Sequence, residues 1–297
     1  MTESKTAFIA IVGCPNVGKS SILNRLLGEK IAIVSSKPQT TRTRIMGVLT
    51  EGETQLVFTD TPGYHKPKNK LGEKMIKAVG EGIHDVDAAL LVIEPKGEIR
   101  EAEQTLLKKF KSAGIPAILA INKVDTVENK EELLSRILEF SKLYDFKAIV
   151  PVSALDGNGL GELLDELKSL AFPSEHLFPD DTLTDQPEKV IAAEYIREKI
   201  LRFTDKEIPH GTAVAIERFR EREDSDILDI EATIYCEKES HKGIIIGKNG
   251  DMLKRISTKA RIDMEKFFGC KVNLKCWVKV KEDWRNREGL IHNFGLD

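Results

Sequence analysis

The sequence G-C-P-N-V-G-K-S at residues 13–20 constrains this chain most, because it fits the pattern G-x-x-x-x-G-K-[ST]. It directly follows a short apolar run at residues 8–12 and leads into a helix-length segment that extends to residue 27. In such a strand–loop–helix frame the loop wraps its N–H groups around phosphates, and the positive end of the helix faces the same anion. The pattern therefore predicts a phosphate-binding loop; the alternative is a chance glycine-rich turn, which the frame disfavours.

Two side chains of this loop carry chemistry that a bound triphosphate needs. The Lys19 ammonium can reach β- and γ-phosphate oxygens, and the Ser20 hydroxyl can ligate Mg²⁺. The other loop residues that we expect to contact the nucleotide are Gly13, Asn16, Val17, Gly18 and Ser21.

Short apolar runs alternate with helix-length segments through the first 172 residues. We predict buried strands at residues 8–12, 55–59, 88–93, 117–121 and 149–152. We predict helices at residues 18–27, 71–84, 101–112, 131–143 and 160–170. Alternation on this scale indicates an α/β domain with a mostly parallel sheet and helices on both faces. An extra strand at residues 45–50 is expected to pair antiparallel with residues 55–59.

Three prolines interrupt this alternation, at Pro173, Pro179 and Pro187, and predict a linker over residues 173–187. The pattern then changes to a helix, two strands, a helical region and a final strand, at residues 189–203, 213–219, 228–236, 241–268 and 272–280. This α-β-β-α-α-β order predicts a smaller α+β domain. The predicted domains are therefore residues 1–172 and 188–297.

A second motif, N-K-V-D at residues 122–125, follows the strand predicted at residues 117–121. The Asp125 carboxylate can accept hydrogen bonds from the N1–H and the exocyclic amine of guanine. Adenine presents an acceptor at N1 and would leave the carboxylate unpaired, which argues against the alternative of an ATPase. The Lys123 stem can cover one face of the ring.

The next predicted strand, at residues 149–152, is followed by the segment S-A-L at residues 153–155. This third segment can offer a backbone N–H to guanine O6. All three segments end at the sheet edge where open α/β sheets bind ligands, and together they favour guanine. The residues expected around the base are Asn122, Lys123, Asp125, Ser153, Ala154 and Leu155.

The segment D-T-P-G at residues 60–63 follows another predicted strand. Asp60 can hold Mg²⁺ through a water, and the Gly63 N–H can meet the γ-phosphate, with Thr61 and Pro62 beside the nucleotide. Loss of that phosphate would release the segment that follows, as in an order–disorder switch.

Residues 34–44 are polar and lack a regular pattern, as expected of a second mobile loop. One of its threonines is expected to reach Mg²⁺ and the γ-phosphate. We choose Thr41, with Thr40 and Thr43 as alternatives. The predicted catalytic set is therefore Lys19, Thr41, Asp60 and Gly63, and the predicted Mg²⁺ ligands are Ser20, Thr41 and Asp60.

A basic block occupies residues 242–281, where 11 basic and 3 acidic side chains give a net charge of +8 in a chain of net charge −3. Such a block is typical of a polyanion-binding surface, although a solvated lysine-rich face is the alternative. Within it, G-K-N-G at residues 247–250 forms a tight turn that a nucleic-acid strand could approach closely.

The helix after this turn and the last strand each show one apolar and one basic face. The helix is expected to bury Met252, Ile256, Ala260, Met264 and Phe267. The strand is expected to bury Val272, Leu274, Cys276, Val278 and Val280. Trp277 could stack on an unpaired base or pack against a neighbouring element. The predicted RNA-binding residues are Ile246, Gly247, Lys248, Asn249, Gly250, Lys254, Arg255, Lys259, Lys275, Trp277 and Lys279.

The nucleotide motifs resemble those of the translation-factor-related superclass of GTPases over residues 7–172. Many GTPases place a glutamine directly after the D-x-x-G glycine to orient the attacking water, but here the residue is Tyr64. We therefore expect slow intrinsic hydrolysis that a partner or a monovalent cation completes. Asn16 resembles the asparagine that helps to hold K⁺ in related GTPases; a hydrogen bond that braces the loop is its alternative role.

A GTPase domain, a proline-containing linker and one C-terminal type II KH domain together resemble the family of bacterial Era-type GTPases, over essentially the whole chain. Tyr64 replaces the leucine or isoleucine that is common there. The resemblance implies that the chain binds single-stranded RNA, the 3′ end of small-subunit ribosomal RNA, while GTP is bound, in assembly of the 30S subunit. It also implies peripheral contact with the inner membrane surface.

We accordingly expect a cytoplasmic monomer. No apolar run approaches the roughly 20 residues of a membrane span, and no signal-peptide pattern opens the sequence. The competing hypothesis is a nucleotide-gated docking protein whose main partner is another protein or the membrane surface rather than RNA.

Overall fold

The computed structural model describes residues 4–64, 67–84 and 86–296, which divide into two compact units. The first unit consists of Met1–Ala32, Thr41–Lys66 and Met75–Asp185. The second consists of Gln186–Asp297 together with two short segments from the N-terminal half, Ile33–Thr40 and Pro67–Lys74. The predicted domain boundaries place these two segments with the first domain, so the compact units and the predicted domains differ there.

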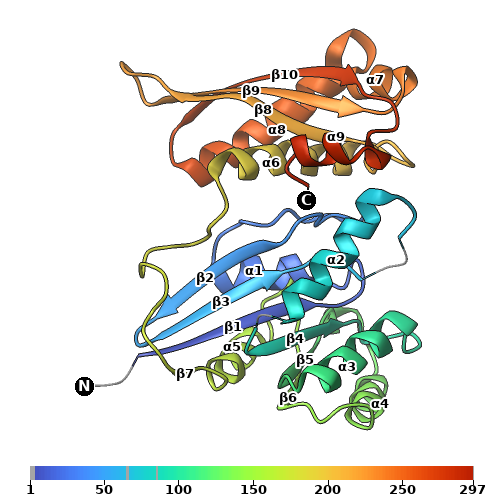
Figure 1. Cartoon of the computed structure of the whole chain (residues 1–297), viewed down its shortest axis with the longest axis vertical. Coiled ribbons are helices and arrows are strands. Elements are labelled where there is room, and N and C mark those ends of the chain that lie inside the picture. Colours follow the sequence, from blue (N-terminus) through green and yellow to red (C-terminus); the bar gives the residue numbers. More distant parts are fainter. Residues whose placement is uncertain (1–3, 65–66, 85, 297) are drawn as a thin grey trace. The chain divides into compact units, whose positions relative to one another are not determined.

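The first unit is built on a mostly parallel sheet (Figure 1). The strand order is β2-β3-β1-β4-β5-β6, and β7 pairs antiparallel with the start of β1. The strands are β1 (Lys5–Val12), β2 (Ile45–Glu51), β3 (Thr54–Asp60), β4 (Ala88–Ile93), β5 (Ala117–Ile121), β6 (Ala148–Pro151) and β7 (Phe172–Pro173). β2 and β3 form the antiparallel hairpin that the sequence predicts. Only β7 has no counterpart among the predicted strands, because two residues carry no periodic pattern.

Helices cover both faces of this sheet, as the alternation of apolar runs and amphipathic segments predicts (Figure 1). On one face α1 and α5 pack together. On the other, apolar side chains of α2, α3 and α4 pack against alternate residues of β1, β4 and β5. The helices are α1 (Lys19–Leu27), α2 (Lys70–His84), α3 (Glu101–Ala113), α4 (Lys130–Ser141) and α5 (Leu160–Lys168). β4 and β5 are fully buried, as expected for central strands covered on both sides.

The proline-containing segment at residues 173–185 packs along the β2–β3 hairpin. The Val48 N–H donates to the Leu183 carbonyl at 2.9 Å. The Gln55 side chain, fully buried, donates to the Phe178 carbonyl at 2.9 Å and accepts from the backbone N–H groups of Leu177 and Phe178. These bonds hold much of the predicted linker against the first unit.

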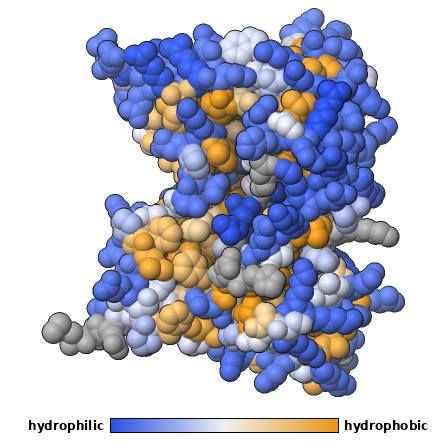
Figure 2. Space-filling view, viewed as in Figure 1, coloured by the Kyte–Doolittle hydropathy of each residue, from blue (hydrophilic) through white to orange (hydrophobic). Residues whose placement is uncertain are grey.

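The second unit contains a three-stranded sheet in the order β10-β9-β8, with β8 and β9 antiparallel and β9 and β10 parallel. Its elements are α6 (Glu188–Phe203), β8 (Ala213–Glu221), β9 (Ile227–Cys236), α7 (Glu239–Ile246), α8 (Asp251–Phe268), β10 (Lys271–Val280) and α9 (Glu288–Asn293). This is the predicted α-β-β-α-α-β order, with α9 added after it. The tip of the β8–β9 hairpin, residues 221–226, is exposed and hydrophilic (Figure 2).

The core of the second unit confirms the two amphipathic patterns. Ile256, Ala260 and Met264 of α8 are buried, and Met252 and Phe267 pack against the same cluster. All five apolar residues expected on the inner face of β10 also belong to this cluster or pack against it. The fold class predicted from the sequence, an α/β GTPase domain followed by a smaller α+β KH domain, is confirmed.

Candidate functional site

The phosphate-binding loop connects β1 to α1, where the sequence predicts it. Gly18 adopts φ 100°, and a Cβ at this position would come within 2.1 Å of the Asn122 amide nitrogen. Asn122 in turn donates to the Val17 carbonyl at 2.8 Å. Glycine is therefore needed at position 18 because the loop that follows β5 packs directly against the phosphate-binding loop.

Lys19 lies inside this loop with only 6% of its surface exposed. Its ammonium donates to the carbonyl oxygens of Gly13 at 3.2 Å and of Cys14 at 3.0 Å. Burial lowers the pKa of Lys19, and the nearby Asp60 charge opposes that shift. A buried ammonium held by two carbonyls is oriented before any ligand arrives, and an anionic phosphate would supply the charge that it lacks.

Three oxygen donors meet beside the first turn of α1. The Ser20 hydroxyl donates to Asp60 Oδ2 at 2.6 Å and lies 3.0 Å from the Thr41 hydroxyl, which is itself 3.3 Å from Asp60 Oδ2. Asp60 Oδ1 is buried, and no described residue is its hydrogen-bond partner. Burial raises the pKa of Asp60, although Lys19 and the two hydroxyls oppose the rise. Hydroxyl and carboxylate oxygens of this kind suit Mg²⁺, and the unbonded Oδ1 could accept a water bound to the ion.

The structure places Thr41, the threonine chosen from the sequence, and its alternative Thr40 in different surroundings. Thr41 is buried beside Ser20 and Asp60, as described above. The Thr40 hydroxyl instead donates to the Lys37 carbonyl at 2.7 Å. Thr43 is half-exposed, two residues beyond the cluster.

The segment after β3 lies against the phosphate-binding loop. The Thr61 hydroxyl, fully buried, donates to the Ile11 carbonyl at 3.0 Å, and the Tyr64 N–H donates to the Gly13 carbonyl at 3.1 Å. The Tyr64 ring contacts the Lys109 ammonium, 5.3 Å from its centroid. Gly63 is thereby placed next to the loop, while residues 65 and 66, at the start of the predicted switch segment, lie outside the described residues.

The predicted base-reading residues converge at the carboxyl ends of β5 and β6. Asn122 is buried and accepts a hydrogen bond from the Ala154 N–H at 3.0 Å, so it joins the base segments to the phosphate-binding loop. The Ser153 hydroxyl donates to Asp125 Oδ1 at 2.6 Å and orients a carboxylate that is otherwise exposed. Lys123 has a left-handed backbone, φ 67°, which fixes the direction in which its side chain leaves the loop.

One residue that supports this site has no signal in the sequence. Arg25 on α1 donates from Nε to the Ala154 carbonyl at 2.9 Å and from its terminal nitrogen to the Leu155 carbonyl. Arg25 thus stabilises the segment at residues 153–155, although it lies 129 residues from Ala154 in the sequence. The remaining predicted contacts surround the loop: Val17 is buried, Ser21 is half-buried, and Asn16 is exposed with φ 65°.

In the second unit, residues 247–250 form the tight turn between α7 and α8. Gly247 adopts φ 76°, and a Cβ there would lie 2.7 Å from Met252 Cβ and 2.8 Å from its backbone nitrogen. Lys248 and Asn249 at the tip are exposed. The turn thus brings its backbone to the surface in a conformation that glycine permits and a side chain at position 247 would oppose.

The predicted RNA-binding residues fall on two surfaces. Lys254, Arg255 and Lys259 are exposed on α8, on the side of the sheet that carries the helices. Lys275, Trp277 and Lys279 are exposed on β10 and alternate with the residues that face α8, so they point to the opposite side of the sheet. Trp277 is 45% exposed. The eleven residues therefore do not form one continuous groove, and those near the turn are separated from those on β10.

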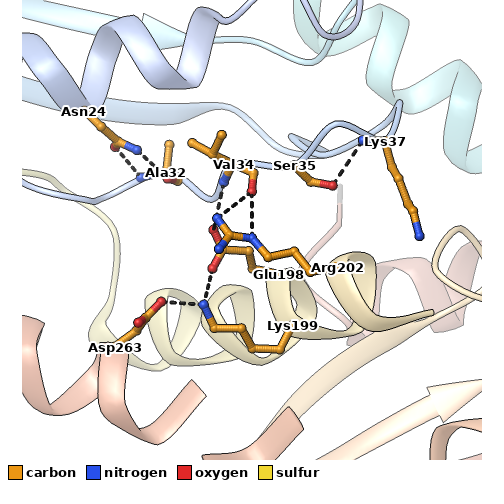
Figure 3. Close-up of polar contacts among 9 residues, drawn as sticks. All are labelled: Asn24, Ala32, Val34, Ser35, Lys37, Glu198, Lys199, Arg202 and Asp263. Atoms are coloured by element: carbon orange, nitrogen blue, oxygen red, sulfur yellow. Dashed lines mark hydrogen bonds and ion pairs between the residues drawn. The ribbon is translucent and has the colours of Figure 1, made fainter. Parts of the chain in front are cut away.

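The segment Ile33–Thr40, directly before Thr41, packs on helix α6 of the second unit (Figure 3). Ile33 is 2% exposed and belongs to that unit's hydrophobic core. The Val34 N–H donates to Glu198 Oε1 at 3.2 Å, and Arg202 donates to the Val34 carbonyl at 3.1 Å. Lys199 joins Glu198 to Asp263 on α8. At its far end, the Thr40 carbonyl accepts from Arg197.

The residue before this segment is held by the first unit. The Asn24 side chain on α1 both donates to the Ala32 carbonyl, at 2.7 Å, and accepts from the Ala32 N–H, at 3.0 Å (Figure 3). Ala32 and Thr41, which flank the segment Ile33–Thr40 in the sequence, both belong to the first unit.

Two features are absent from the described residues. No group of three or more His, Cys, Asp or Glu side chains among them could hold a metal ion. No helix in the described part of the chain is long and apolar enough to cross a membrane.

Comparison with known proteins matched two family models. Residues 8–123 match a model described as 50S ribosome-binding GTPase, and residues 207–285 match the KH domain. The protein named GTPase Era of Clostridioides difficile (strain 630) is 49% identical over 293 residues, which cover 99% of each chain. GTPase Era of Thermoanaerobacter sp. (strain X514) is 48% identical over 291 residues, 98% of this chain and 96% of that protein.

Two solved structures share the fold over nearly the whole chain. A variant of Aquifex aeolicus Era bound to GDP and AlF4⁻ superposes with a TM-score of 0.94 at 38% identity, covering 98% of this chain and 99% of that one. Era in complex with MgGDPNP and nucleotides 1506–1542 of 16S ribosomal RNA gives the same TM-score and identity and covers 99% of each chain.

Proposed function

This chain belongs to the Era family of GTPases, and on that premise we propose that its bound guanine nucleotide sets the affinity of its C-terminal unit for single-stranded RNA. The chain hydrolyses GTP to GDP and phosphate, as its family membership shows. The proposal assigns the phosphates to the loop at residues 13–20 and the RNA to the turn at residues 247–250. The connection between them is the segment Ile33–Thr40.

Different residues around the phosphate-binding loop are assigned to the phosphates, to Mg²⁺ and to the guanine base. The loop N–H groups and the Lys19 ammonium bind the β- and γ-phosphate oxygens. Because the ammonium is buried and already oriented, its binding to phosphate needs little rearrangement of the site. Ser20, Asp60 and Thr41 would hold Mg²⁺, which supplies positive charge against the phosphates when it is bound. A related Era structure contains MgGDPNP, which supports this assignment. Asp125 accepts hydrogen bonds from the guanine edge, with its carboxylate held by Ser153.

Hydrolysis by the chain alone is expected to be slow. Tyr64 stands where many GTPases place a water-orienting glutamine, and a phenol ring lacks the amide that would position the attacking water. We propose that a partner or K⁺ near Asn16 raises the rate. Turnover compared in KCl and in NaCl at equal ionic strength measures the contribution of K⁺, and equal rates would exclude it.

The RNA-binding part of the proposal centres on the turn at residues 247–250 and the basic residues of α8. An exposed, glycine-flanked turn next to Lys254 and Lys259 can clamp the backbone of an unpaired strand. A related Era structure contains nucleotides 1506–1542 of 16S ribosomal RNA, so we propose the 3′ end of small-subunit ribosomal RNA as the ligand and 30S assembly as the role. Cytoplasmic localisation, a monomeric state and peripheral membrane contact remain predictions.

The observation that carries the coupling is the position of Ile33–Thr40. Thr41 lies beside Ser20 and Asp60, where it can sense Mg²⁺ and the γ-phosphate. The eight residues before it contribute a buried side chain to the core of the second unit and bond to α6. Because Thr40 and Thr41 are neighbours in the chain, a change at Thr41 is proposed to reach α6, the helix that packs against α8, through this segment.

The experiment is an RNA titration in two nucleotide states. Affinity for a fluorescent single-stranded RNA that carries the 3′ sequence of small-subunit ribosomal RNA is measured with GDP and with a non-hydrolysable GTP analogue. We expect at least about fivefold tighter binding with the analogue, which corresponds to a coupling free energy of about 1 kcal/mol. Equal affinities would contradict the proposal.

A paired variant locates the RNA. Gly247→Asp combined with Gly250→Asp places two negative side chains on the turn and is expected to abolish measurable RNA binding, while GTP turnover without RNA is unchanged. Undiminished RNA binding would favour the competing hypothesis of a docking protein with a protein or membrane partner. Gly269→Asp, in the exposed turn before β10, is the control for charge and glycine loss.

A further inference from the structure

A carboxylate at the end of β4, Glu94, lies between the two loops that surround the nucleotide. β4 is the strand between β1, which leads to the phosphate-binding loop, and β5, which leads to Asn122 and Lys123 (Figure 1). Parallel strands end at a common edge, so Glu94 leaves the sheet between the phosphate loop and the base segment. None of the sequence motifs includes this residue.

Both oxygens of Glu94 have cationic partners. Oε1 accepts from the Lys123 ammonium at 2.6 Å, and Oε2 accepts from the Arg100 guanidinium at 2.8 Å. Burial would raise the pKa of Glu94, but the hydrogen bonds and charges of Lys123 and Arg100 outweigh it and hold the pKa below its usual value. The carboxylate is therefore ionised at neutral pH.

The groups around Glu94 are themselves fixed. The buried Arg136 donates to the Glu94 carbonyl at 3.4 Å and stacks on the Phe140 ring, 4.6 Å from its centroid. The nearby Cys14 thiol, within the phosphate-binding loop, and the Glu94 carboxylate both contribute to raising the pKa of Arg100. The Glu94 backbone is thus held by Arg136 and its Oε2 by Arg100, and its Oε1 is placed to orient Lys123.

We infer that Glu94 is a positioning residue for guanine nucleotides: its carboxylate holds Lys123 so that the aliphatic stem covers one face of the base. This inference rests on the proposed placement of guanine against Lys123. A free lysine side chain has many rotamers, and a bound base would have to select one of them. Glu94 holds Lys123 in one rotamer before the nucleotide binds. Less side-chain entropy is then lost on binding, and the affinity for the nucleotide is higher.

The inference predicts where Glu94 acts. In this inference the aliphatic stem of Lys123 covers one face of the purine ring. Guanine, in GDP, and hypoxanthine, in IDP, have similar ring faces. Loss of Glu94 should therefore weaken GDP and IDP by the same factor. Asp125 reads the exocyclic amine that IDP lacks, so its variants should separate the two nucleotides.

The experiment measures dissociation of fluorescent N-methylanthraniloyl-GDP from the full chain. Glu94→Gln keeps the size of the side chain and removes its charge, and we expect about fivefold faster dissociation, the factor that corresponds to the net contribution of one ordinary hydrogen bond. Glu98→Gln removes an exposed carboxylate from the same loop and is expected to match the parent chain. Equal rates for these two variants would overturn the inference.

A double-mutant cycle distinguishes positioning from general support of the fold. Lys123→Met keeps most of the stem and removes the ammonium, so Glu94→Gln should have no further effect in that background. A second fivefold loss there would show that Glu94 acts independently of Lys123 and would overturn the inference. Glu94→Asp, which keeps the charge on a shorter side chain, is expected to fall between parent and Glu94→Gln.

The same cycle separates this inference from the proposed site. If Lys123→Met leaves GDP dissociation unchanged, guanine does not use Lys123, and both the placement and the inference fail. If Lys123→Met accelerates dissociation while Glu94→Gln does not, the placement stands and the inference alone fails.

Discussion

Two glycine-flanked turns in this chain, at residues 13–20 and 247–250, are the proposed binding sites for phosphate-bearing ligands, and they differ in what surrounds them. The turn at residues 13–20 contains a lysine that is 6% exposed, next to a fully buried aspartate. The turn at residues 247–250 carries its lysine and asparagine in solvent. In the first turn the charged groups are buried and held by hydrogen bonds, whereas in the second turn the lysine side chain is exposed to water.

This difference suits the two turns to two kinds of ligand. A buried, oriented charge interacts strongly with a single phosphate group and is little affected by salt. An exposed lysine interacts weakly with any phosphate, and its contribution falls as salt rises because condensed ions compete for the nucleic acid. The first turn is suited to a defined small ligand, and the second to a flexible polyanion.

The largest effect should come from exchanging the lysine of each turn for methionine. Lys19→Met removes the oriented cation from the phosphates, and we expect kcat/KM for GTP to fall by about 100-fold or more. Lys248→Met makes the same exchange in solvent and should weaken RNA binding about threefold at low salt. Steady-state turnover and RNA titration measure the two losses, and similar losses in both would remove the contrast between the turns.

The next largest effect tests whether the first site reads one base. Asp125→Asn keeps an oxygen that can accept the Ser153 hydrogen bond but replaces the other oxygen by a donor, which opposes the N–H groups of guanine. We expect about 100-fold weaker GTP binding and a gain for xanthosine triphosphate. Competition titrations measure both, and unchanged GTP affinity would count against guanine recognition.

A smaller effect should appear in the segment that we propose to couple the two sites. Arg202→Ala removes both hydrogen bonds from this guanidinium to the Val34 carbonyl. We expect the ratio of RNA affinities between the GTP analogue and GDP to fall about threefold, since the variant removes two of the several hydrogen bonds that hold the segment on α6.

The matched control for that variant is Lys189→Ala, which removes an exposed cation from the same helix. It should lower RNA affinity slightly in both nucleotide states and leave their ratio unchanged. An unchanged ratio in Arg202→Ala as well would show that Val34 does not carry the coupling.

The smallest effect concerns acid stability of the second unit. Hydrogen bonds from Arg222 and Asn273 hold the pKa of Asp229 well below its usual value of 3.8. A lowered folded-state pKa stabilises the fold above the unfolded pKa, and this contribution disappears as pH falls through the folded pKa. Asp229→Asn should therefore lower the Tm by roughly 1–3 °C at pH 7 and by less below pH 3.

Tryptophan fluorescence can follow this transition selectively, because both tryptophans of the chain, Trp277 and Trp284, belong to the second unit. A difference in Tm that stays constant from pH 7 to pH 2 would contradict the role of the Asp229 charge.

Much of the first unit was predictable because its chemistry is carried by short, contiguous motifs. The residues of a phosphate-binding loop lie within eight positions, and the strand before it and helix after it are visible as local periodicity. The same holds for α8 and β10, whose buried residues recur at helical and at alternating spacing. The β2–β3 hairpin was predictable because two strands with a short turn between them have few other ways to pair.

The apolar and basic faces of α8 and β10 followed from their residue spacing, but how the two basic faces are arranged around the sheet does not follow from local sequence. Lys275 and Lys254 both belong to the basic block, yet they lie on opposite sides of the sheet. The position of the core decides this, and it depends on how α6, α7 and α8 pack together. The prolines at 173–187 indicated a linker, but the burial of Gln55 against that segment has no local signal.

The sequence by itself determined which chemical groups the proposed sites contain: a lysine and a hydroxyl that follow a glycine-rich loop, carboxylates at or just after the ends of strands, and a glycine-flanked turn in a basic block. Local spacing sets these features, and each is complete within a few residues. Only the tertiary structure decided that Thr41 rather than Thr40 lies beside Ser20 and Asp60, that Glu94 bonds to Lys123, and that Ile33 joins the second core. Those contacts join residues that are distant in sequence, and they form only when the whole chain packs and loop closure has been offset by burial.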